Sequence, residues 1–362
     1  MDAIAHSALS HAASRGTIAA DLLAWYDTHA RALPWRVRPG GNAADPYRVW
    51  LSEVMLQQTT VAAVIPYFAA FTARWPTVAD LAAAPEEDVM AAWAGLGYYS
   101  RARKLVECAR AVAAMGGFPG TEAELRALPG LGPYTAAAVA AIAFGQRAVV
   151  VDANVERVVA RLFAIDDPLP GGRAAIRAAT DAITPDARCG DFAQGVMDLG
   201  ASICRARDAQ CLICPLSAHC AARVAGDPLT YPVKPAKVAK PERQGRAYAL
   251  IRDAGAGAQV WLVRRAGKGL LGGMRALPDD GWTARADGSA TPPMPGDWRA
   301  GGRLRHVFTH FALALELQVY LAPPSATPPS GEGEWWPLAQ IEQAGLPTVF
   351  ARAAALIPRA PD

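Results

Sequence analysis

The sequence lacks any apolar run long enough to cross a membrane. Its longest run, Tyr134 to Phe144, is followed at once by glycine, glutamine and arginine and is much shorter than the roughly 20 residues of a transmembrane helix. The first sixteen residues contain no basic stretch followed by an apolar core, so no secretory signal is visible. We therefore expect a cytoplasmic protein that does not act at a membrane.

The sequence also has little excess charge. The net charge is only +3 over 362 residues, too small to indicate nucleic-acid binding by itself. Residues 227–247 carry five lysines and arginines against two acidic residues, and they hold most of the excess. Any nucleic-acid contact elsewhere must rely on locally placed cations and backbone amides. Lysine is scarce as well, because Lys104 is the only lysine in residues 1–226.

Cysteine is rare but clustered. Of six cysteines, Cys204, Cys211, Cys214 and Cys220 lie within 17 residues in the spacing C-x6-C-x2-C-x5-C. Four thiolates so close together can surround a tetrahedral zinc ion or an iron–sulfur cluster. Structural zinc usually takes two short cysteine pairs separated by a dozen or more residues, so this spacing favours the cluster, with zinc as the alternative. Disulfides are disfavoured in a cytoplasmic chain.

Proline and hydrophobic periodicity divide the chain into two domains. Residues 227–247 include a proline-rich stretch with no helical or alternating pattern and are predicted to be a linker. Residues 1–226 show helical spacing of apolar residues, and residues 248–362 show short strand-like runs. The predicted fold is an all-α domain followed by a smaller α/β domain.

Individual elements follow from local signals. Asp45, Thr121 and Asp191 are predicted to precede helices, because these residue types cap helix N-termini. The tail is predicted to contain strands and one helix. The expected elements are helices over Tyr47–Gln57, Tyr134–Phe144 and Phe192–Ser202, strands over Tyr248–Arg252, Gln259–Arg264 and Phe311–Tyr320, and a helix near Val349–Leu356.

Three features of the helical part could carry chemistry. Leu128 to Gly132 reads LPGLG between two helical patterns, and such a turn either points free amides at a phosphate or forms an ordinary helical hairpin. Asp152 follows three β-branched residues near a helix start, where an acid is most often a cap. Glu53 lies among apolar neighbours, so it is either exposed on a polar face or held in a pocket that raises its pKa.

The sequence as a whole resembles a known family, the adenine DNA glycosylases of the helix–hairpin–helix superfamily (the MutY family). The resemblance runs nearly end to end and rests on several motifs in a fixed order. They are LPWR at 33–36, SEVMLQQT at 52–59, GLGYYSRAR at 95–103, LPGLGPYTA at 128–136, VDANVERV at 151–158, MDLG at 197–200 and the cysteine loop at 204–220.

The resemblance implies a helix–hairpin–helix glycosylase domain over residues 1–226. Its cysteine loop, 204–220, would bind a structural 4Fe-4S cluster. In the family, the residue matching Glu53 protonates adenine at N7, and the aspartate matching Asp152 stabilises the sugar cation or briefly bonds to the sugar. Two acids with different protonation states suit glycosidic bond hydrolysis. Tyr134 and Asn154 complete the expected catalytic set.

DNA contacts are also implied by the resemblance. A base buried in a duplex must be extruded before it can be cleaved, and Gln58 and Tyr98 would fill the gap in the stack. The family resemblance places three residues in the adenine pocket, Trp35, Arg36 and Asp198. The glycines of the hairpin, Gly130 and Gly132, would bring backbone amides to the DNA phosphates.

Tyr134 distinguishes the chain from the endonuclease III branch. That branch has lysine at this position and uses its amine to form a Schiff base and cut the strand. The expected activity is therefore that of a monofunctional glycosylase that leaves an abasic site. The alternatives are an endonuclease III-like glycosylase/lyase and a non-catalytic iron–sulfur DNA-binding protein, although the latter would not need Glu53 and Asp152 together.

The tail, residues 248–362, resembles the Nudix-like C-terminal domain of the same family. It has no Arg-Glu-x-x-Glu-Glu run to hold magnesium, so it is expected to bind without hydrolysing. Phe308, Thr309 and His310 take the place of the family's Phe-Ser-His loop, which reads 8-oxoguanine opposite adenine. The expected partner is duplex DNA with adenine opposite 8-oxoguanine or guanine, bound by a monomer, with replication or repair proteins docking on the linker.

Overall fold

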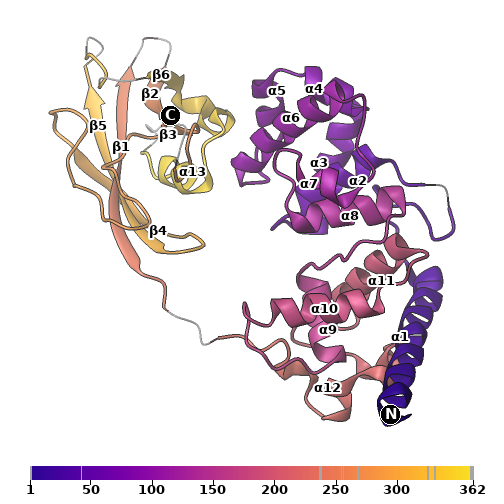
Figure 1. Cartoon of the computed structure of the whole chain (residues 1–362). Helices are drawn as coiled ribbons and strands as arrows, with labels where there is room; N and C mark the ends of the chain where they lie inside the picture. The colour runs from indigo at the N-terminus through magenta and orange to yellow at the C-terminus, as the bar shows by residue number, and fades with distance from the viewer. Residues whose placement is uncertain are drawn as a thin grey trace. The chain divides into compact units, whose positions relative to one another are not determined.

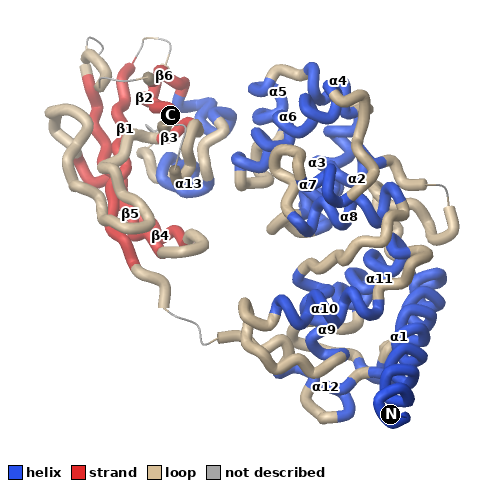
Figure 2. The backbone as a smooth tube through the Cα atoms, in the orientation of Figure 1, coloured by secondary structure: helices blue, strands red, loops and turns tan. Residues whose placement is uncertain are grey.

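The computed structural model describes residues 2–41, 43–235, 239–253, 255, 257–266, 269–323, 326–329 and 332–358, with side chains from residue 16 onward. The chain forms two compact units, Met1–Ala236 and Lys237–Asp362 (Figure 1). The first is helical and the second is built on a sheet (Figure 2). No helix within these described ranges is long and apolar enough to span a bilayer.

The helical unit consists of two halves. Figure 1 shows α2 to α8 in one half and α1 with α9 to α12 in the other. The chain passes between the halves after α1 and after α8. The helices are α1 (Asp2–His29), α2 (Pro46–Leu56), α3 (Val61–Arg74), α4 (Val78–Ala83), α5 (Glu86–Ala92), α6 (Tyr99–Ala114), α7 (Glu122–Arg126), α8 (Pro133–Phe144), α9 (Ala153–Leu162), α10 (Arg173–Ile183), α11 (Cys189–Ser202) and α12 (Ala221–Val224), with 3-10 turns η1 (Cys211–Ile213), η2 (Ser217–His219) and η3 (Pro228–Thr230).

Two of the three predicted caps are confirmed and one is wrong. The side chain of Asp45 accepts from the amide of Tyr47 at the start of α2, and Thr121 accepts from Glu124 at the start of α7. Asp191 instead lies in the first turn of α11, whose cap residue is Arg188. An acid inside the first turn still interacts favourably with the positive end of the helix dipole. An aspartate near a helix start can therefore lie within the first turn as well as at the cap position, and the sequence pattern does not distinguish the two.

The core of the helical unit is one continuous apolar cluster. Large buried side chains such as Trp50, Phe68, Phe71 and Trp93 fill the half formed by α2 to α6. α8 is buried almost all round, which suits a sequence made largely of alanine because small side chains let neighbouring helices approach closely. α2 and α11 both pack against this helix, so it connects the two halves.

The second unit is a mixed six-stranded sheet. Its strands are β1 (Glu242–Asp253), β2 (Ala258–Arg264), β3 (Arg275–Ala276), β4 (Arg299–Val307), β5 (Ala312–Ala322) and β6 (Gly333–Pro337), in the order β3-β2-β1-β5-β4 with β6 beside β2. β1 and β5 run parallel and the other pairs are antiparallel. η4 (Leu338–Ala344) and α13 (Thr348–Ala354) complete the core of this unit.

The structure differs from the predicted linker, residues 227–247, at both ends. η3 belongs to the helical unit, where the carbonyl of Tyr231 accepts from Arg161 and that of Val233 accepts from Leu169. β1 already begins at Glu242, well before the strand start predicted at Tyr248. Polar and glycine residues at the start of β1 concealed the strand, because its pairing with β5 is specified by backbone hydrogen bonds rather than by apolar side chains.

Candidate active site

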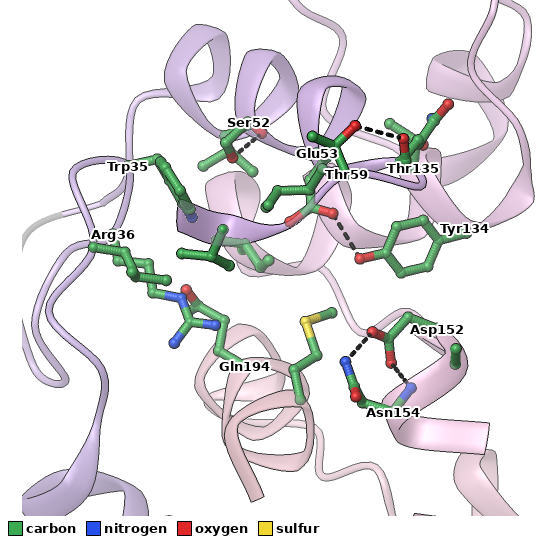
Figure 3. A pocket seen from close by; sticks show the side chains of 18 of the residues that line it. Trp35, Arg36, Ser52, Glu53, Thr59, Tyr134, Thr135, Asp152, Asn154 and Gln194 are labelled. Atoms are coloured by element: carbon green, nitrogen blue, oxygen red, sulfur yellow. Dashed lines mark hydrogen bonds between the residues drawn. The ribbon is translucent and has the colours of Figure 1, made fainter. Parts of the chain in front are cut away.

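A cavity of about 670 Å³ lies between the two halves of the helical unit. Its walls come from α2 and α8 on one side and from the start of α9 and from α11 on the other (Figure 3). Both suspected acids, Glu53 and Asp152, line it, together with Trp35, Arg36 and Tyr134. The fold therefore brings to one place residues that are far apart in the sequence.

Glu53 projects from α2 and is only 7% exposed. The Tyr134 hydroxyl, on α8, donates to Glu53 Oε2 at 2.6 Å. Burial raises the pKa of the Glu53 carboxyl, and the nearby Asp152 charge raises it further, while the Tyr134 hydrogen bond and Arg36 lower it. Of the two alternatives for Glu53, an exposed polar face and a pocket that raises its pKa, the structure shows the pocket. The pKa of Tyr134 is itself raised well above its usual value, mainly by burial, so this hydroxyl keeps its proton and remains a donor.

Asp152 caps the N-terminus of α9. Its Oδ1 accepts from the backbone amides of Asn154 at 2.9 Å and Val155 at 2.7 Å, and its Oδ2 accepts from Asn154 Nδ2 at 2.8 Å. Burial raises the pKa of this carboxyl, while the three hydrogen bonds and Arg157 lower it. In the part of the chain that the structure describes, Glu53 accepts one hydrogen bond and Asp152 accepts three at a helix N-terminus, so Asp152 is the better placed of the two to carry the negative charge.

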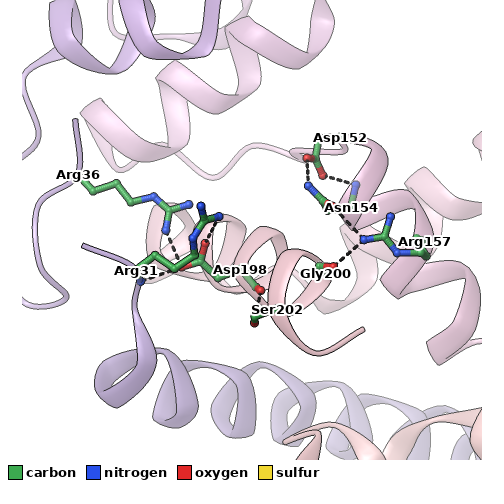
Figure 4. A network of polar contacts seen from close by, with 8 residues as sticks. All are labelled: Arg31, Arg36, Asp152, Asn154, Arg157, Asp198, Gly200 and Ser202. Atoms are coloured by element: carbon green, nitrogen blue, oxygen red, sulfur yellow. Dashed lines mark hydrogen bonds and ion pairs between the residues drawn. The ribbon is translucent and has the colours of Figure 1, made fainter. Parts of the chain in front are cut away.

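Arg36 reaches the cavity with the support of a buried acid. Its Nη1 donates to Asp198 Oδ2 at 2.6 Å, and the amide of Arg31 donates to the same oxygen at 3.1 Å (Figure 4). Asp198 is completely buried, and it is absent from the cavity lining that the described residues form. This differs from the expectation that Asp198 would lie in the adenine pocket. A buried carboxylate requires paired donors, so Asp198 holds the two arginines instead.

Gln58 and Tyr98 both lie in unusual backbone conformations. Gln58 follows the end of α2 with φ 59°, and Tyr98 precedes α6 with φ 50°. Residues with a Cβ rarely adopt this left-handed region. Both side chains are exposed, Tyr98 to 48%. Gln58 lines the cavity, whereas Tyr98 lies outside its lining.

The hairpin between α7 and α8 presents exposed glycines. Gly130 has φ 77°, and a Cβ there would lie 2.7 Å from Lys104 Cβ, so both the backbone and the space require glycine. Gly132 caps α8, Pro133 follows it in the first turn, and a Cβ at Gly132 would meet no neighbouring side chain or backbone within 4 Å. Free amides at the start of a twelve-residue helix suit the phosphate-binding alternative.

The four clustered cysteines line one small cavity beside α9. Arg161, 2% exposed, donates from Nη1 to Cys204 Sγ at 3.3 Å and to the carbonyl of Arg205 at 2.8 Å. Burial, together with the other three thiols, raises the pKa of Cys214 to about 11. No group of three or more His, Cys, Asp or Glu side chains in the described ranges is placed to hold a metal ion. The loop supplies four thiols around this one cavity beside a buried cation, and it is the chemistry of these donors that suits an iron–sulfur cluster.

The predicted recognition loop of the second unit is a tight turn between β4 and β5. The amide of Phe308 donates to the carbonyl of Phe311 at 2.8 Å, and the two rings stack with centroids 4.6 Å apart. Lys240 Nζ donates to the Phe308 carbonyl at 2.8 Å. Thr309 and His310 are left exposed at the tip.

Comparisons with known proteins agree with this arrangement. Residues 51–179 match the HhH-GPD superfamily of base excision DNA repair proteins, and residues 247–356 match the NUDIX domain. The adenine DNA glycosylase of Homo sapiens is 34% identical over 399 residues, which cover 91% of this chain and 72% of the human protein. The chain belongs to the adenine DNA glycosylase family.

A second relative supports this membership, and a solved structure supports the glycosylase fold. The adenine DNA glycosylase of Mycolicibacterium smegmatis is 41% identical over 238 residues, which cover 64% of this chain and 80% of that protein. A solved structure of a thermostable thymine-DNA glycosylase aligns with a TM-score of 0.53 at 30% identity, covering 59% of this chain and 97% of that one. This family member is therefore a base excision repair DNA glycosylase with a helix–hairpin–helix domain and a Nudix-like domain.

Several residues of the glycosylase cavity were missed by sequence reasoning. Arg31, Gln194 and Met197 line it. Arg31 lies two residues before the LPWR motif, and Gln194 is a buried amide in α11. The only signal in the sequence was a polar residue at a position where helical spacing predicts an apolar one, as for Gln194.

Proposed function

We propose that this glycosylase extrudes adenine paired with 8-oxoguanine or guanine from duplex DNA and hydrolyses its N-glycosidic bond, leaving an abasic site. One observation carries the mechanistic part of the proposal. A buried carboxyl with a raised pKa, Glu53, accepts from Tyr134 in the same cavity that Asp152 lines.

Hydrolysis of an N-glycosidic bond needs a protonated leaving base and negative charge near the sugar as oxocarbenium character develops. Glu53 in its neutral form donates a proton to adenine N7, and the bond between the sugar C1′ and the base breaks with its electron pair going to the base. A water molecule then adds to C1′ and gives a proton back to the Glu53 carboxylate. The Asp152 carboxylate, fixed by its three hydrogen bonds, stabilises the positive sugar. Asn154 fixes the orientation of that carboxylate, and Tyr134 fixes that of Glu53.

DNA binding is proposed to use three parts of the helical unit. The amides at Gly130 and Gly132 approach phosphates, while Gln58 and Tyr98 fill the gap left by the extruded base. Trp35, which packs edge-on against Phe68 with ring centroids 5.3 Å apart, forms an apolar wall for that base. Arg36 adds donors, and Asp198 supports it from behind.

The lyase alternative has weaker support. Tyr134 has no amine with which to form a Schiff base. Lys104, the only lysine of residues 1–226, projects from α6, pairs with Glu107 at 2.5 Å and does not belong to the described lining of the cavity. We therefore propose that strand cleavage requires a later step or another enzyme.

We propose that Cys204, Cys211, Cys214 and Cys220 bind a 4Fe-4S cluster. When bound, such a cluster supplies a rigid, negatively charged centre whose thiolate ligands are permanently deprotonated. Arg161, buried beside Cys204, supplies a compensating positive charge. The cluster's proposed role is to shape the loop and position it on DNA, because hydrolysis involves no electron transfer.

The Nudix-like unit is proposed to recognise 8-oxoguanine opposite the adenine. Thr309 and His310 offer a hydroxyl and an imidazole at an exposed turn whose base is stiffened by the Phe308–Phe311 stack. The added methyl of Thr309, compared with the family's serine, reduces the space at this tip. We propose that the protein acts as a monomer on one lesion.

The test is single-turnover excision on three duplexes that carry adenine opposite 8-oxoguanine, guanine or thymine, each with and without alkali. Strand breaks that need alkali and form fastest opposite 8-oxoguanine support the proposal. Glu53→Gln keeps the size of the side chain and removes the acid, so it should bind the duplex yet excise about 10² to 10⁴-fold more slowly. Wild-type cutting without alkali, or normal turnover by Glu53→Gln, would overturn it.

A further inference from the structure

Arg101 joins the two loops that carry Gln58 and Tyr98. It projects from the first turn of α6, and its guanidinium lies between the end of α2 and the loop that precedes α6. From Nη1 it donates to the carbonyls of Val54 at 2.9 Å and Met55 at 3.2 Å, and also to that of Gln57. These are carbonyls at the C-terminal end of α2, where helix carbonyls have no partner inside the helix.

The other side of the same guanidinium faces the second loop and the residue after Gln58. Arg101 Nη2 donates to Thr59 Oγ1 at 3.3 Å and to the carbonyls of Leu96 at 3.4 Å and Gly97 at 3.5 Å. The guanidinium carbon lies 5.1 Å from the centre of the Tyr98 ring and 5.4 Å from that of Trp93. One planar cation thus contacts the Gln57 carbonyl and the Thr59 hydroxyl, on the two sides of Gln58, and the ring of Tyr98.

This arrangement explains how two residues with a Cβ are kept at positive φ. Such conformations are unfavourable and persist only where the surroundings impose them. Arginine suits the task because its five donors lie in one rigid plane and its face stacks on aromatic rings. The Nε of Arg101 is buried without a hydrogen-bond partner in the described part of the chain. The guanidinium therefore lies where its contacts with the two loops place it, although this position leaves one of its donors unpaired.

We propose that Arg101 is a positioning residue that holds Gln58 and Tyr98 in a fixed relative geometry before DNA binds. The inference rests on the proposed function, in which these two side chains fill the stack when adenine is extruded. Groups that are already ordered lose less conformational freedom on binding. A preorganised pair therefore favours the extruded state, whose formation otherwise costs unstacking and unpairing energy.

A purely structural role predicts something different. If Arg101 only joins α2 to α6, its replacement lowers the free energy of unfolding but leaves extrusion unchanged in every folded, DNA-bound molecule. If it positions the two side chains, extrusion itself becomes less favourable. The fluorescence of 2-aminopurine, placed as the target base and quenched while stacked, separates the two roles.

The experiment uses the full chain with Glu53→Gln as the parent, so that excision does not obscure extrusion. Arg101→Lys and Arg101→Gln are compared at saturating protein with Arg110→Gln, a matched control that removes an exposed cation from the same helix. We expect the Arg101 variants to lower the extrusion equilibrium about tenfold, equivalent to about 1.4 kcal/mol, and the control to match the parent.

Each outcome decides the inference. A parent-like fluorescence rise in folded, bound Arg101 variants overturns the positioning role and leaves the proposed function intact. Absence of any rise in the parent, together with absence of adenine excision by the wild type, overturns both. If neither Arg101 variant folds, Thr59→Ala removes one acceptor of the guanidinium, and an unchanged fluorescence rise in that milder variant likewise overturns the inference.

Discussion

Replacing Asp152 with asparagine should cost both stability and activity, for separable reasons. Oδ1 of Asp152 accepts from two backbone amides, so the oxygen of the new amide will keep that place. The new NH2 group then points at Asn154 Nδ2, which is also a donor. Asn154 cannot simply turn over, because its Oδ1 accepts from Arg157 Nη2 at 2.9 Å. The two facing NH2 groups therefore stay opposed, because neither amide can rotate without losing another hydrogen bond.

The expected stability loss is about 1–3 kcal/mol, the usual penalty for a buried donor left without an acceptor. The helix cap itself survives, because asparagine caps as well as aspartate. Chemical denaturation of Asp152→Asn against the wild type measures this loss. Excision should fall by about 10² to 10³-fold, the typical effect of removing one electrostatic stabiliser of a transition state.

The double variant Asp152→Asn/Asn154→Asp separates the two effects. It restores a donor–acceptor pair between positions 152 and 154 and keeps an acceptor for Arg157, so stability should return. The negative charge, however, has moved away from its original position, so excision should remain low. Recovery of full excision in the double variant would refute the assignment of the charge to Asp152, and unchanged stability in the single variant would refute the hydrogen-bond argument.

Three further predictions concern other parts of the molecule. Excision should decline as pH rises through the raised pKa of Glu53. The hydrogen bond from Tyr134 lowers the Glu53 pKa, so Tyr134→Phe should raise this pKa and move the decline to higher pH. Single-turnover rates measured against pH test this prediction, and a shift of the decline to lower pH contradicts it. Cys211→Ser should lose the visible absorption of an iron–sulfur cluster and unfold at lower denaturant; a colourless wild type with stoichiometric zinc, purified anaerobically, would contradict the cluster. His310→Ala should reduce the preference for 8-oxoguanine over guanine without changing excision opposite guanine; an unchanged preference ratio would exclude the tip from recognition.

The sequence predicted the site largely because its residues sit in dense local motifs. Local patterns drew attention to Glu53, Asp152 and the cysteine loop but left open a surface acid for Glu53, a plain helix cap for Asp152 and zinc for the cysteines. Their expected roles came from the family resemblance. The strands of the tail were predicted where apolar residues alternate, as in β5. The start of β1 was missed because its pairing with β5 is a long-range backbone property that leaves no local pattern in side chains.

Residues that act through other residues were the hardest to predict. Asp198 was expected to face the base, but it lies buried behind Arg36, and no local pattern distinguishes these two positions. Arg101 lies within the GLGYYSRAR motif, yet its role depends on carbonyls over forty residues earlier in the chain. Such contacts follow only from the packing of α2 against α6.

The two acids of the cavity differ in how selection would act on them if activity were lost. In the described part of the chain Glu53 has one hydrogen-bond partner, Tyr134, so an uncharged replacement that still accepts from Tyr134, such as glutamine, would relieve the desolvation penalty and stabilise the fold. Asp152 caps a helix, so its removal is harmful even in an inactive protein. An inactive descendant would therefore discard Glu53 early and retain Asp152. When a related sequence is assessed for activity, an aspartate at position 152 is weak evidence, and a glutamate at position 53 is strong evidence.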